Sequence, residues 1–324
     1  MKKIVIAVIV LFALFEVYDI YDIWNTEIKP WKYIIQSWDT TAFLPSRFDF
    51  SVSSFNYKIW LRFFAKSIKL KAWTYAVDKT TTLNGLISNG LNKPTSEDRE
   101  ITILPWWNIF DVDAYLAKNW IINPWELKGI WKDVINSLSA KYSFLKWVDS
   151  LEGFLYPDTY RISLKADLNS VLTILLDTFD ERVYSQLKWE SKDFYSDVIM
   201  ASIVEREEKS PENKKVVAGI LKKRLAEKIA IWADATVCYA YDLTQQDCTP
   251  AFIGEVIYKK SPYNTRNMLW LPPTPISNPS LDTIKSTIFS VDSPYYYYLH
   301  DDSWNIHYAK TLQEHSRNKE LYIK

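Results

Sequence analysis

Residues 201–207 read ASIVERE and belong to a longer segment, residues 192–208, in which apolar residues recur at helical spacing. The apolar positions before the first glutamate are Val198, Ile199, Ile203 and Val204. Glu205 follows them directly, near the expected end of the helix. We therefore expect one face of this helix to enter the core of a domain, with Glu205 beside that face and over a cleft.

A second interpretation of the same helix end is a solvated acidic face. Glu205, Glu207 and Glu208 stand there beside Arg206 and Lys209, a pattern that is typical of an exposed helix surface. The local pattern alone favours this interpretation. The choice between the two therefore depends on residues elsewhere in the chain.

The chain around this helix alternates amphipathic and proline-rich segments. The elements that these patterns predict are helices at 167–188 and 213–228, an extended loop with five prolines at 261–280, and paired strands at 295–299 and 306–308. Pro211 separates the last helix from the central one. Residues 151–324 are therefore expected to form a mixed, helix-rich domain.

The preceding part of the chain has shorter elements. They are strands at 48–52 and 101–103, a helix at 82–91 that ends at Gly90, and helices at 108–118 and 124–138. Residues 48–150 are therefore expected to form a small α+β unit, behind a linker at residues 25–47. The fold class that we predict for the whole chain is α+β.

The N-terminus has the pattern of a membrane anchor. Lys2 and Lys3 precede an apolar run at residues 4–15, which continues with interruptions to Trp24. A retained signal anchor at residues 1–24 would keep the N-terminus in the cytoplasm and place the rest of this single-pass chain outside the cytoplasmic membrane. A cleaved signal peptide and a buried N-terminal helix are the alternatives.

Composition excludes several classes of function. The chain has 39 basic and 39 acidic residues, so no net positive field attracts nucleic acid, which we exclude as a partner. Its two cysteines, Cys238 and Cys248, rule out a multi-thiolate metal site but could close a short loop as a disulfide. The three histidines follow no metal-binding spacing, and no serine-protease motif with a glycine elbow is present. We therefore expect no cofactor and no metal.

Six segments, in order along the chain, resemble the YceG-like endolytic murein transglycosylase family. They are residues 151–160 (LEGFLYPDTY), 201–207, 217–220 (VAGI) with Arg224 and Leu225, 234–237 (DATV), 261–265 (SPYNT) with 271–279 (LPPTPISNP), and 311–315 (TLQEH). The resemblance implies a LysM-like α+β subdomain at 48–150 and a catalytic domain at 151–324. It also implies a tether to the outer face of the cytoplasmic membrane.

The resemblance further implies an activity. Such enzymes cut the bond between N-acetylmuramic acid and N-acetylglucosamine within nascent peptidoglycan strands and leave a 1,6-anhydro end. The implied partners are glycan strands and peptidoglycan synthases, and the implied catalytic acid is Glu205. One carboxyl is enough for this lyase reaction, because the nucleophile is the 6-hydroxyl of the sugar itself rather than water.

Six further residues in these segments are candidates for binding the glycan. They are Glu152, Asp158, Asp234, Thr236, Tyr263 and Asn264. Each has a structural alternative: Asp158 could close a turn, Asp234 could cap a helix, and the loop that carries Tyr263 could simply be rigid.

Tryptophan stands at several positions where the family carries glycine. The chain has 6 glycines and 15 tryptophans, whereas ordinary glycine usage of about 7% would give about 23 glycines. The positions in question are Trp73, Trp106, Trp120, Trp125, Trp232, Trp270 and Trp304. Our hypothesis is that the source organism translates the codon UGA as glycine, so that these positions are glycines in the natural protein and tryptophans only in the written sequence. Trp107 would be a true tryptophan. Aromatic enrichment for stacking on carbohydrate is the alternative.

A non-catalytic scaffold of the same fold that binds cell-wall glycan is the main alternative function. Trp232 and Trp270, if they are real, would crowd a glycan groove and favour that interpretation.

Overall fold

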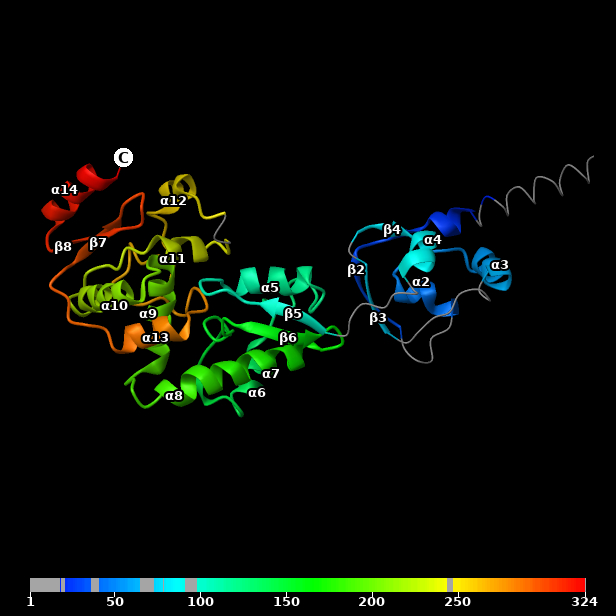
Figure 1. Cartoon of the computed structure of the whole chain (residues 1–324), viewed down its shortest axis with the longest axis horizontal. Coiled ribbons are helices and arrows are strands. Elements are labelled where there is room, and N and C mark those ends of the chain that lie inside the picture. Colours follow the sequence, from blue (N-terminus) through cyan, green and yellow to red (C-terminus); the bar gives the residue numbers. More distant parts are fainter. Residues whose placement is uncertain are drawn as a thin grey trace, which may run out of the picture. The chain divides into compact units, whose positions relative to one another are not determined.

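The computed structural model of the chain describes residues 18, 21–35, 41–64, 73–77, 79–90, 98–243 and 247–323. Contacts divide the chain into two units, residues 1–99 with 163–165 and residues 100–162 with 166–324 (Figure 1). Residues 100–150, which the sequence analysis grouped with the first unit, thus belong to the second by compactness. The assignment of residues 48–150 to a LysM-like subdomain stays a prediction.

The expected membrane anchor at residues 1–24 falls mostly outside the described residues. Among the residues that are described, no helix is long and apolar enough to span a bilayer. The anchor therefore stays a prediction.

The first unit combines short strands and helices. Its elements are β1 (Glu27–Ile28), β2 (Trp31–Ile35), η1 (Thr41–Phe43), α2 (Leu44–Arg47), α3 (Ser54–Phe64), β3 (Trp73–Val77), β4 (Thr81–Thr82), α4 (Leu83–Gly85) and the π-helical turn η3 (Leu86–Gly90). Strand β2 pairs with β3 in antiparallel register, from Trp31 opposite Val77 to Ile35 opposite Trp73. Strand β1 pairs with β4. The helical segment expected at 82–91 is confirmed, with Thr82 as its N-cap.

The strand expected at 48–52 is wrong. Asp49 has φ 49°, which turns the chain between Phe48 and Phe50 and brings both rings into the core. Helix α3 then begins at Ser54. Alternating apolar residues mimicked a strand here, because a turn at the intervening aspartate also buries both neighbours.

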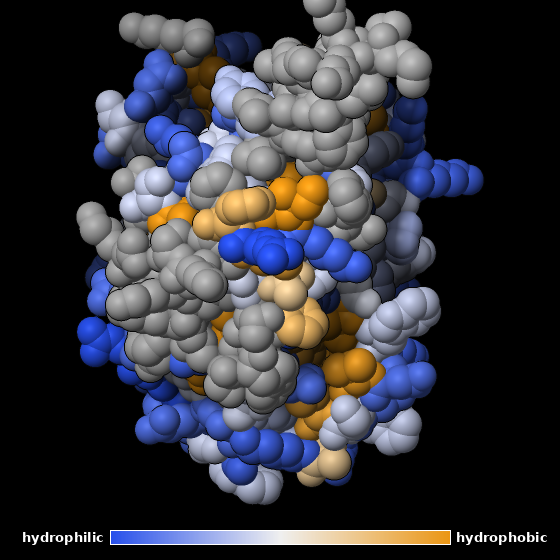
Figure 2. Space-filling model, turned by 90° about the vertical axis from the view of Figure 1, so that its right-hand side faces the viewer, coloured by the Kyte–Doolittle hydropathy of each residue, from blue (hydrophilic) through white to orange (hydrophobic). Residues whose placement is uncertain are grey.

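Figure 2 shows hydrophobic residues in several places between hydrophilic residues on the face that it draws. The exposed aromatic residues of the first unit include Tyr18, Tyr21, Phe43 and Phe63. Scattered exposed aromatic side chains are normal for a folded unit and need no partner to explain them.

The second unit is built around helix α9. Its elements are β5 (Asp98–Thr102), α5 (Ile109–Lys118), α6 (Lys132–Leu138), η4 (Ser143–Leu145), β6 (Thr159–Ser163), α7 (Leu168–Phe179), η5 (Asp180–Tyr184), α8 (Ser185–Leu187), α9 (Phe194–Glu207), α10 (Pro211–Ala226), α11 (Asp234–Tyr239), α12 (Pro250–Val256), α13 (Leu281–Ile288), β7 (Tyr297–His300), β8 (Ile306–Ala309) and α14 (Leu312–Tyr322). Residues 198–205 of α9 are all buried, and the helix packs against α10, α11 and α13 (Figure 1).

The central helix, the helix after Pro211 and the C-terminal hairpin are confirmed. The helix expected at 124–138 begins only at Lys132. The buried carboxylate of Asp113 accepts the backbone N–H groups of Trp125, Leu127 and Lys128 at 2.8–3.2 Å, which holds that stretch in a turn instead.

The backbone conformation at position 153 explains why the segment at 151–160 has a glycine there. Its φ is +88°, and a Cβ placed there would lie 2.6 Å from Cγ of Pro275. Asn278 Oδ1 accepts N–H groups from Gly153 and Leu155 at 3.0 Å, so the segment is fastened to the proline-rich loop. The loop in turn reaches the end of α9.

We expect Gly153→Ala to lower the free energy of unfolding by at least about 2 kcal/mol, because alanine meets both a positive φ and a clash with Pro275. Urea unfolding of the purified chain measures this loss. Gly254→Ala is the matched control: it lies in α12 with no atom within 4 Å of its Cβ position, so it should be neutral or stabilising by about 0.5–1 kcal/mol. Equal effects of the two variants would contradict this account of Gly153.

Six tryptophans have left-handed backbone conformations. Among the described residues, nine non-glycine residues have positive φ, and six of them are tryptophans with φ from 62° to 70°. They are Trp106, Trp120, Trp125, Trp147, Trp232 and Trp304. Trp147 has a positive φ although it was not among the predicted positions. Trp73, in strand β3, and Trp270 were predicted but are not among the positive-φ residues. The left-handed region favours glycine, so the positions in this set support the recoding hypothesis.

Candidate active site

A cavity of about 440 Å³ lies at the C-terminal end of α9. Its lining is dominated by charged side chains together with two of the positive-φ tryptophans. The lining residues are Pro105, Trp106, Glu205, Arg206, Glu207, Glu208, Lys209, Lys214, Ser280 and Trp304. Glu205 thus lies at a hollow in the protein surface, as the sequence predicted.

The proline-rich loop brings Ser280 to this cavity. Ile276 N–H donates to Ser202 Oγ at 2.9 Å, and Ser277 Oγ donates to the Ser202 carbonyl at 3.0 Å, so the loop is fastened to the middle of α9. Ser280 then caps α13, where its hydroxyl accepts the N–H of Thr283. The first turn of α13 is thereby held against Glu205.

Glu205 receives four hydrogen bonds. Lys214 Nζ donates to Oε1 at 3.1 Å, while Oε2 accepts the Ser280 N–H and hydroxyl at 2.8 Å and the Thr283 hydroxyl at 2.5 Å. Lys214 Nζ also donates to Thr283 Oγ1 at 2.6 Å. Glu205 and Lys214 are 7% and 5% exposed, so they form a buried ion pair and not a solvated acidic face.

The two glutamates that follow have different surroundings. Burial raises the pKa of Glu207, whose Oε2 accepts the Tyr298 hydroxyl at 2.9 Å. Burial also acts on Glu208, but hydrogen bonds from His300 and from the backbone N–H groups of Ser210 and Lys209 outweigh it and lower its pKa. The pKa values of these two carboxyl groups are therefore shifted in opposite directions.

A sequence model of the YceG-like family matches residues 46–321, which is most of the chain. The chain belongs to the YceG-like family. Two curated relatives carry the name endolytic murein transglycosylase. The protein of Streptococcus pneumoniae is 29% identical over 190 residues, which cover 57% of this chain and 34% of the relative. That of Bacillus subtilis is 28% identical over 181 residues, covering 53% and 48%.

The YceG-like chain therefore matches between a third and a half of the length of these relatives. A crystal structure of a putative YceG-like protein from Listeria monocytogenes has a similar fold, with a TM-score of 0.56 and 19% identity. The similarity covers 90% of this chain and 99% of that one. The predicted family and the mixed α+β fold are thus confirmed.

None of the six predicted glycan-binding residues lines the Glu205 cavity in the described structure. Glu152 is fully buried, and its Oε2 accepts the N–H of Ile109 at 2.8 Å at the start of α5. A side chain without solvent contact cannot bind a glycan, so the structure argues against that role. The Asp158 carboxylate accepts the N–H of Thr159 and pairs with Arg182 at 3.0 Å, so its side chain has structural partners.

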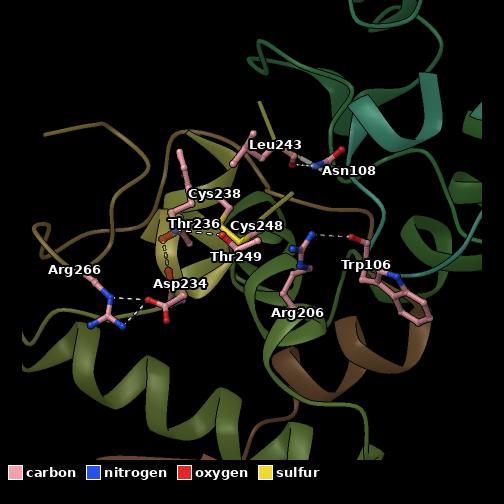
Figure 3. Close-up of a disulfide and its surroundings, with 12 residues drawn as sticks. Trp106, Asn108, Arg206, Asp234, Thr236, Cys238, Leu243, Cys248, Thr249 and Arg266 are labelled. Carbon is pink, nitrogen blue, oxygen red and sulfur yellow. Dashed lines mark hydrogen bonds and ion pairs between the residues drawn. A yellow bond between two sulfur atoms is a disulfide. The ribbon is translucent and has the colours of Figure 1, made fainter. Parts of the chain in front are cut away.

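The other candidates mainly hold loops together. Asp234 is the first residue of α11 and not its N-cap, and it pairs with Arg266 (Figure 3). Thr236 is buried and exchanges a hydrogen bond of 2.8 Å with Thr265. Asn264 is also buried and donates to two backbone carbonyls at 2.8 and 2.9 Å. Tyr263 is half-buried and bonds to the hydroxyl of Thr274 at 3.0 Å.

Cys238 and Cys248 form the predicted disulfide, with their Cα atoms 5.6 Å apart (Figure 3). The bond closes the segment between α11 and α12. Thr236 lies on the same helix, α11, as Cys238 (Figure 3).

Sequence reasoning missed Lys214 and Thr283 as partners of Glu205. Lys214 stands in a lysine-rich stretch that resembles an exposed helix surface, so nothing local marked it as buried. Ser280 followed by an acidic residue, Asp282, is a helix-start signal and could have placed α13. Its position against Glu205 depends on tertiary packing.

The buried Glu152 predicts how stability depends on pH. Burial raises its pKa from 4.5 to about 8. The native state therefore binds a proton between these pH values that the unfolded chain has released. The stabilising contribution is full below about pH 4.5 and is lost as pH rises to about 8, by on the order of 3–5 kcal/mol.

Glu152→Gln should remove this loss, because glutamine stays neutral and can still accept the N–H of Ile109. We expect the variant to be more stable than the parent chain at pH 9 and similar to it at pH 4.5, as measured by urea unfolding at each pH. The same pH dependence in both proteins would show that Glu152 is not its source.

Proposed function

We propose that this chain is an endolytic peptidoglycan transglycosylase. It cleaves the bond between N-acetylmuramic acid and N-acetylglucosamine in nascent glycan strands and leaves 1,6-anhydro-N-acetylmuramic acid ends. The observation that carries the proposal is the position of Glu205, a buried carboxyl that is held by four hydrogen bonds and lines a cavity, in a chain whose named relatives are murein transglycosylases.

The surroundings of Glu205 fit this chemistry. In the simplest form of the reaction, one carboxyl protonates the leaving oxygen and then takes the proton of the 6-hydroxyl as that oxygen closes on C1. The hydroxyl belongs to the same sugar ring, so it acts at high effective concentration and no water is needed. Lys214, Ser280 and Thr283 fix the carboxyl in one orientation, which such a transfer requires.

We also propose a single-pass location at the cytoplasmic membrane, anchored by residues 1–24, with both units outside it and in contact with glycan strands and peptidoglycan synthases. The disulfide between Cys238 and Cys248 supports the outside location, since disulfides persist in oxidising compartments.

A non-catalytic glycan-binding scaffold is the second candidate. It is favoured by Trp106 and Trp304, whose indoles line the cavity beside Glu205 in the sequence as written. Trp232 and Trp270, which would crowd a glycan groove if they are real, do not line this cavity.

The deciding experiment incubates the full chain in detergent with glycan strands freshly polymerised from lipid-linked precursor. A transglycosylase shortens the strands from within, and mass spectrometry finds anhydro ends. Strands that are bound and sedimented with the protein but keep their length support the scaffold and contradict the proposed activity.

A further inference from the structure

Two of the six positive-φ tryptophans line the cavity that contains Glu205. They are Trp106 and Trp304, with φ 68° and 62°. Trp106 lies before α5, and Trp304 lies between β7 and β8. Two distant parts of the chain thus bring a backbone that favours glycine to the same cavity. The other four are not among the lining residues: Trp120, Trp125, Trp147 and Trp232.

The first of these positions is in a tight turn. The N–H of Trp107 donates to the carbonyl of Leu104 at 3.4 Å, with Pro105 and Trp106 between them. Proline as the second residue of a turn and a positive φ at the third are typical of a type II turn, whose third residue is usually glycine. The indole of Trp106 therefore projects from a turn that is built for a residue without a side chain.

The second position is at the tip of a hairpin. The N–H of Trp304 donates to the carbonyl of Asp301 at 2.9 Å, and its side chain is more than half exposed. The ammonium of Lys209, which also lines the cavity, lies 4.0 Å from the centre of the indole, a cation–π contact that holds the ring there. The indole therefore occupies space at the cavity that glycine would leave open.

Both segments are fastened to the end of the helix that carries Glu205. Arg206 Nη1 donates to the carbonyl of Trp106 at 3.3 Å (Figure 3). On the hairpin side, the Tyr298 hydroxyl donates to Glu207 at 2.9 Å. Arg206 and Glu207 follow Glu205 directly in the chain, so they hold the turn and the hairpin beside it.

The cavity is small for the substrate of the proposed reaction. Its volume of about 440 Å³ lies in the lower part of the range, about 300–1,000 Å³, of pockets that enclose one drug-sized ligand. An enzyme that cuts a strand from within binds sugars on both sides of the broken bond. It needs a cleft in which the strand can continue in both directions, and the two indoles reduce the space for it.

We propose that the turn at 104–107 and the hairpin tip at 301–305 form walls of the glycan cleft at Glu205, with glycine at positions 106 and 304 in the natural protein. Glycine has no Cβ, so it lets a backbone approach a ligand closely. An internal segment of a glycan strand then lies against two backbone segments instead of two indoles. This inference rests on the proposed function and adds to it the positions that admit the strand.

The paired change Trp106→Gly with Trp304→Gly tests the inference in the full chain. The substrate is glycan strands polymerised from lipid-linked precursor, and the rate is that at which anhydro ends form. We expect KM to fall by at least about tenfold while kcat changes little, because the change widens the cleft and leaves the hydrogen-bond partners of Glu205 in place.

Trp120→Gly with Trp125→Gly is the matched control. This pair also replaces two left-handed tryptophans and should stabilise the chain to a similar extent, but neither residue lines the cavity. Its KM should stay near that of the chain as written. The two paired variants are compared at equal concentrations of folded protein, so a gain in stability alone does not separate them.

Equal KM values in the two paired variants would overturn the inference. A higher KM after the changes at 106 and 304 would also overturn it, since the indoles would then bind the sugar rings by stacking. If neither pair forms anhydro ends, the proposed function has failed, and co-sedimentation with the strands decides the inference instead. The variant with glycine at 106 and 304 should then bind strands at least about tenfold more tightly than the control, and equal binding would contradict the proposed cleft.

Discussion

Replacing the six positive-φ tryptophans with glycine should stabilise the protein by several kcal/mol. A bulky residue held in the left-handed region costs about 1–3 kcal/mol, and six such sites together approach the whole stability of an ordinary domain, about 5–15 kcal/mol. Three of the indoles contribute little to packing, since Trp125, Trp147 and Trp304 are 68%, 97% and 57% exposed. The measurement is the urea midpoint of the sixfold variant against that of the chain as written.

Trp120 shows most clearly why glycine belongs at such a site. The N–H of Trp120 donates to the carbonyl of Ala117, and that of Ile121 to the carbonyl of Leu116, both at 3.0 Å. This is the pattern of a Schellman motif at the end of α5, in which the residue at φ 64° is usually glycine.

Trp304 is the corresponding case in a hairpin. Its N–H donates to the carbonyl of Asp301, and the N–H of Asp301 donates to that of Asn305, so three residues, 302–304, form the loop inside the last bonded pair of the hairpin. The last residue of such a loop is left-handed, which favours glycine.

Trp107→Gly is the control for the stability measurement. Trp107 is not among the positive-φ residues, and its ring packs on Tyr115 with centroids 4.9 Å apart, so this change should destabilise. A sixfold variant that is no more stable than the chain as written would contradict the account of these sites.

The recoding hypothesis has its own test, which is the mass of peptides from protein made by its source. Peptides that span the six sites should be lighter by the difference between tryptophan and glycine, whereas Trp107 should keep its indole. The same spectra show whether positions 73 and 270 carry tryptophan or glycine, because the backbone at these two positions is compatible with both. UGG codons, which encode tryptophan, at the six sites would contradict the hypothesis.

Much of the second unit could be predicted from its sequence, because local signals and tertiary packing agree there. Helix α9, Pro211 at the start of α10 and the β7–β8 hairpin follow from periodicity and proline alone. These features depend on residues close together in the chain. The position of Glu205 at a cavity does not follow from its local pattern, which favours a solvated face; it was expected from the resemblance of the surrounding segments to the family.

The glycan-binding role of the six candidates, by contrast, stays a prediction. Asn264 and Thr236 stand in segments that the family shares, but their side chains satisfy buried backbone and hydroxyl groups. A polar loop residue that the family shares can bind substrate or hold the loop in place, and sequence alone does not distinguish these two roles. Lys214 was missed because its burial depends on its ion pair with Glu205, which lies nine positions earlier on another helix.

Glu205→Gln should abolish turnover, with a loss of at least about 10²–10⁴-fold in kcat, because an amide can neither give nor take the proton. The change also removes the charge opposite Lys214 in a buried pair, so we expect a loss of stability of up to about 3–5 kcal/mol. The double variant Glu205→Gln with Lys214→Met removes both charges. It should recover stability without recovering activity, which separates loss of chemistry from loss of fold.

The most direct test of the central claim is cleavage of glycan strands in water enriched in heavy oxygen, followed by mass spectrometry of the new ends. The account predicts 1,6-anhydro ends that carry no heavy oxygen, produced by the full chain and absent with Glu205→Gln. Reducing ends that carry heavy oxygen would identify a hydrolase, and equal cleavage by the Glu205→Gln variant would remove Glu205 from the chemistry. Either result would contradict the account.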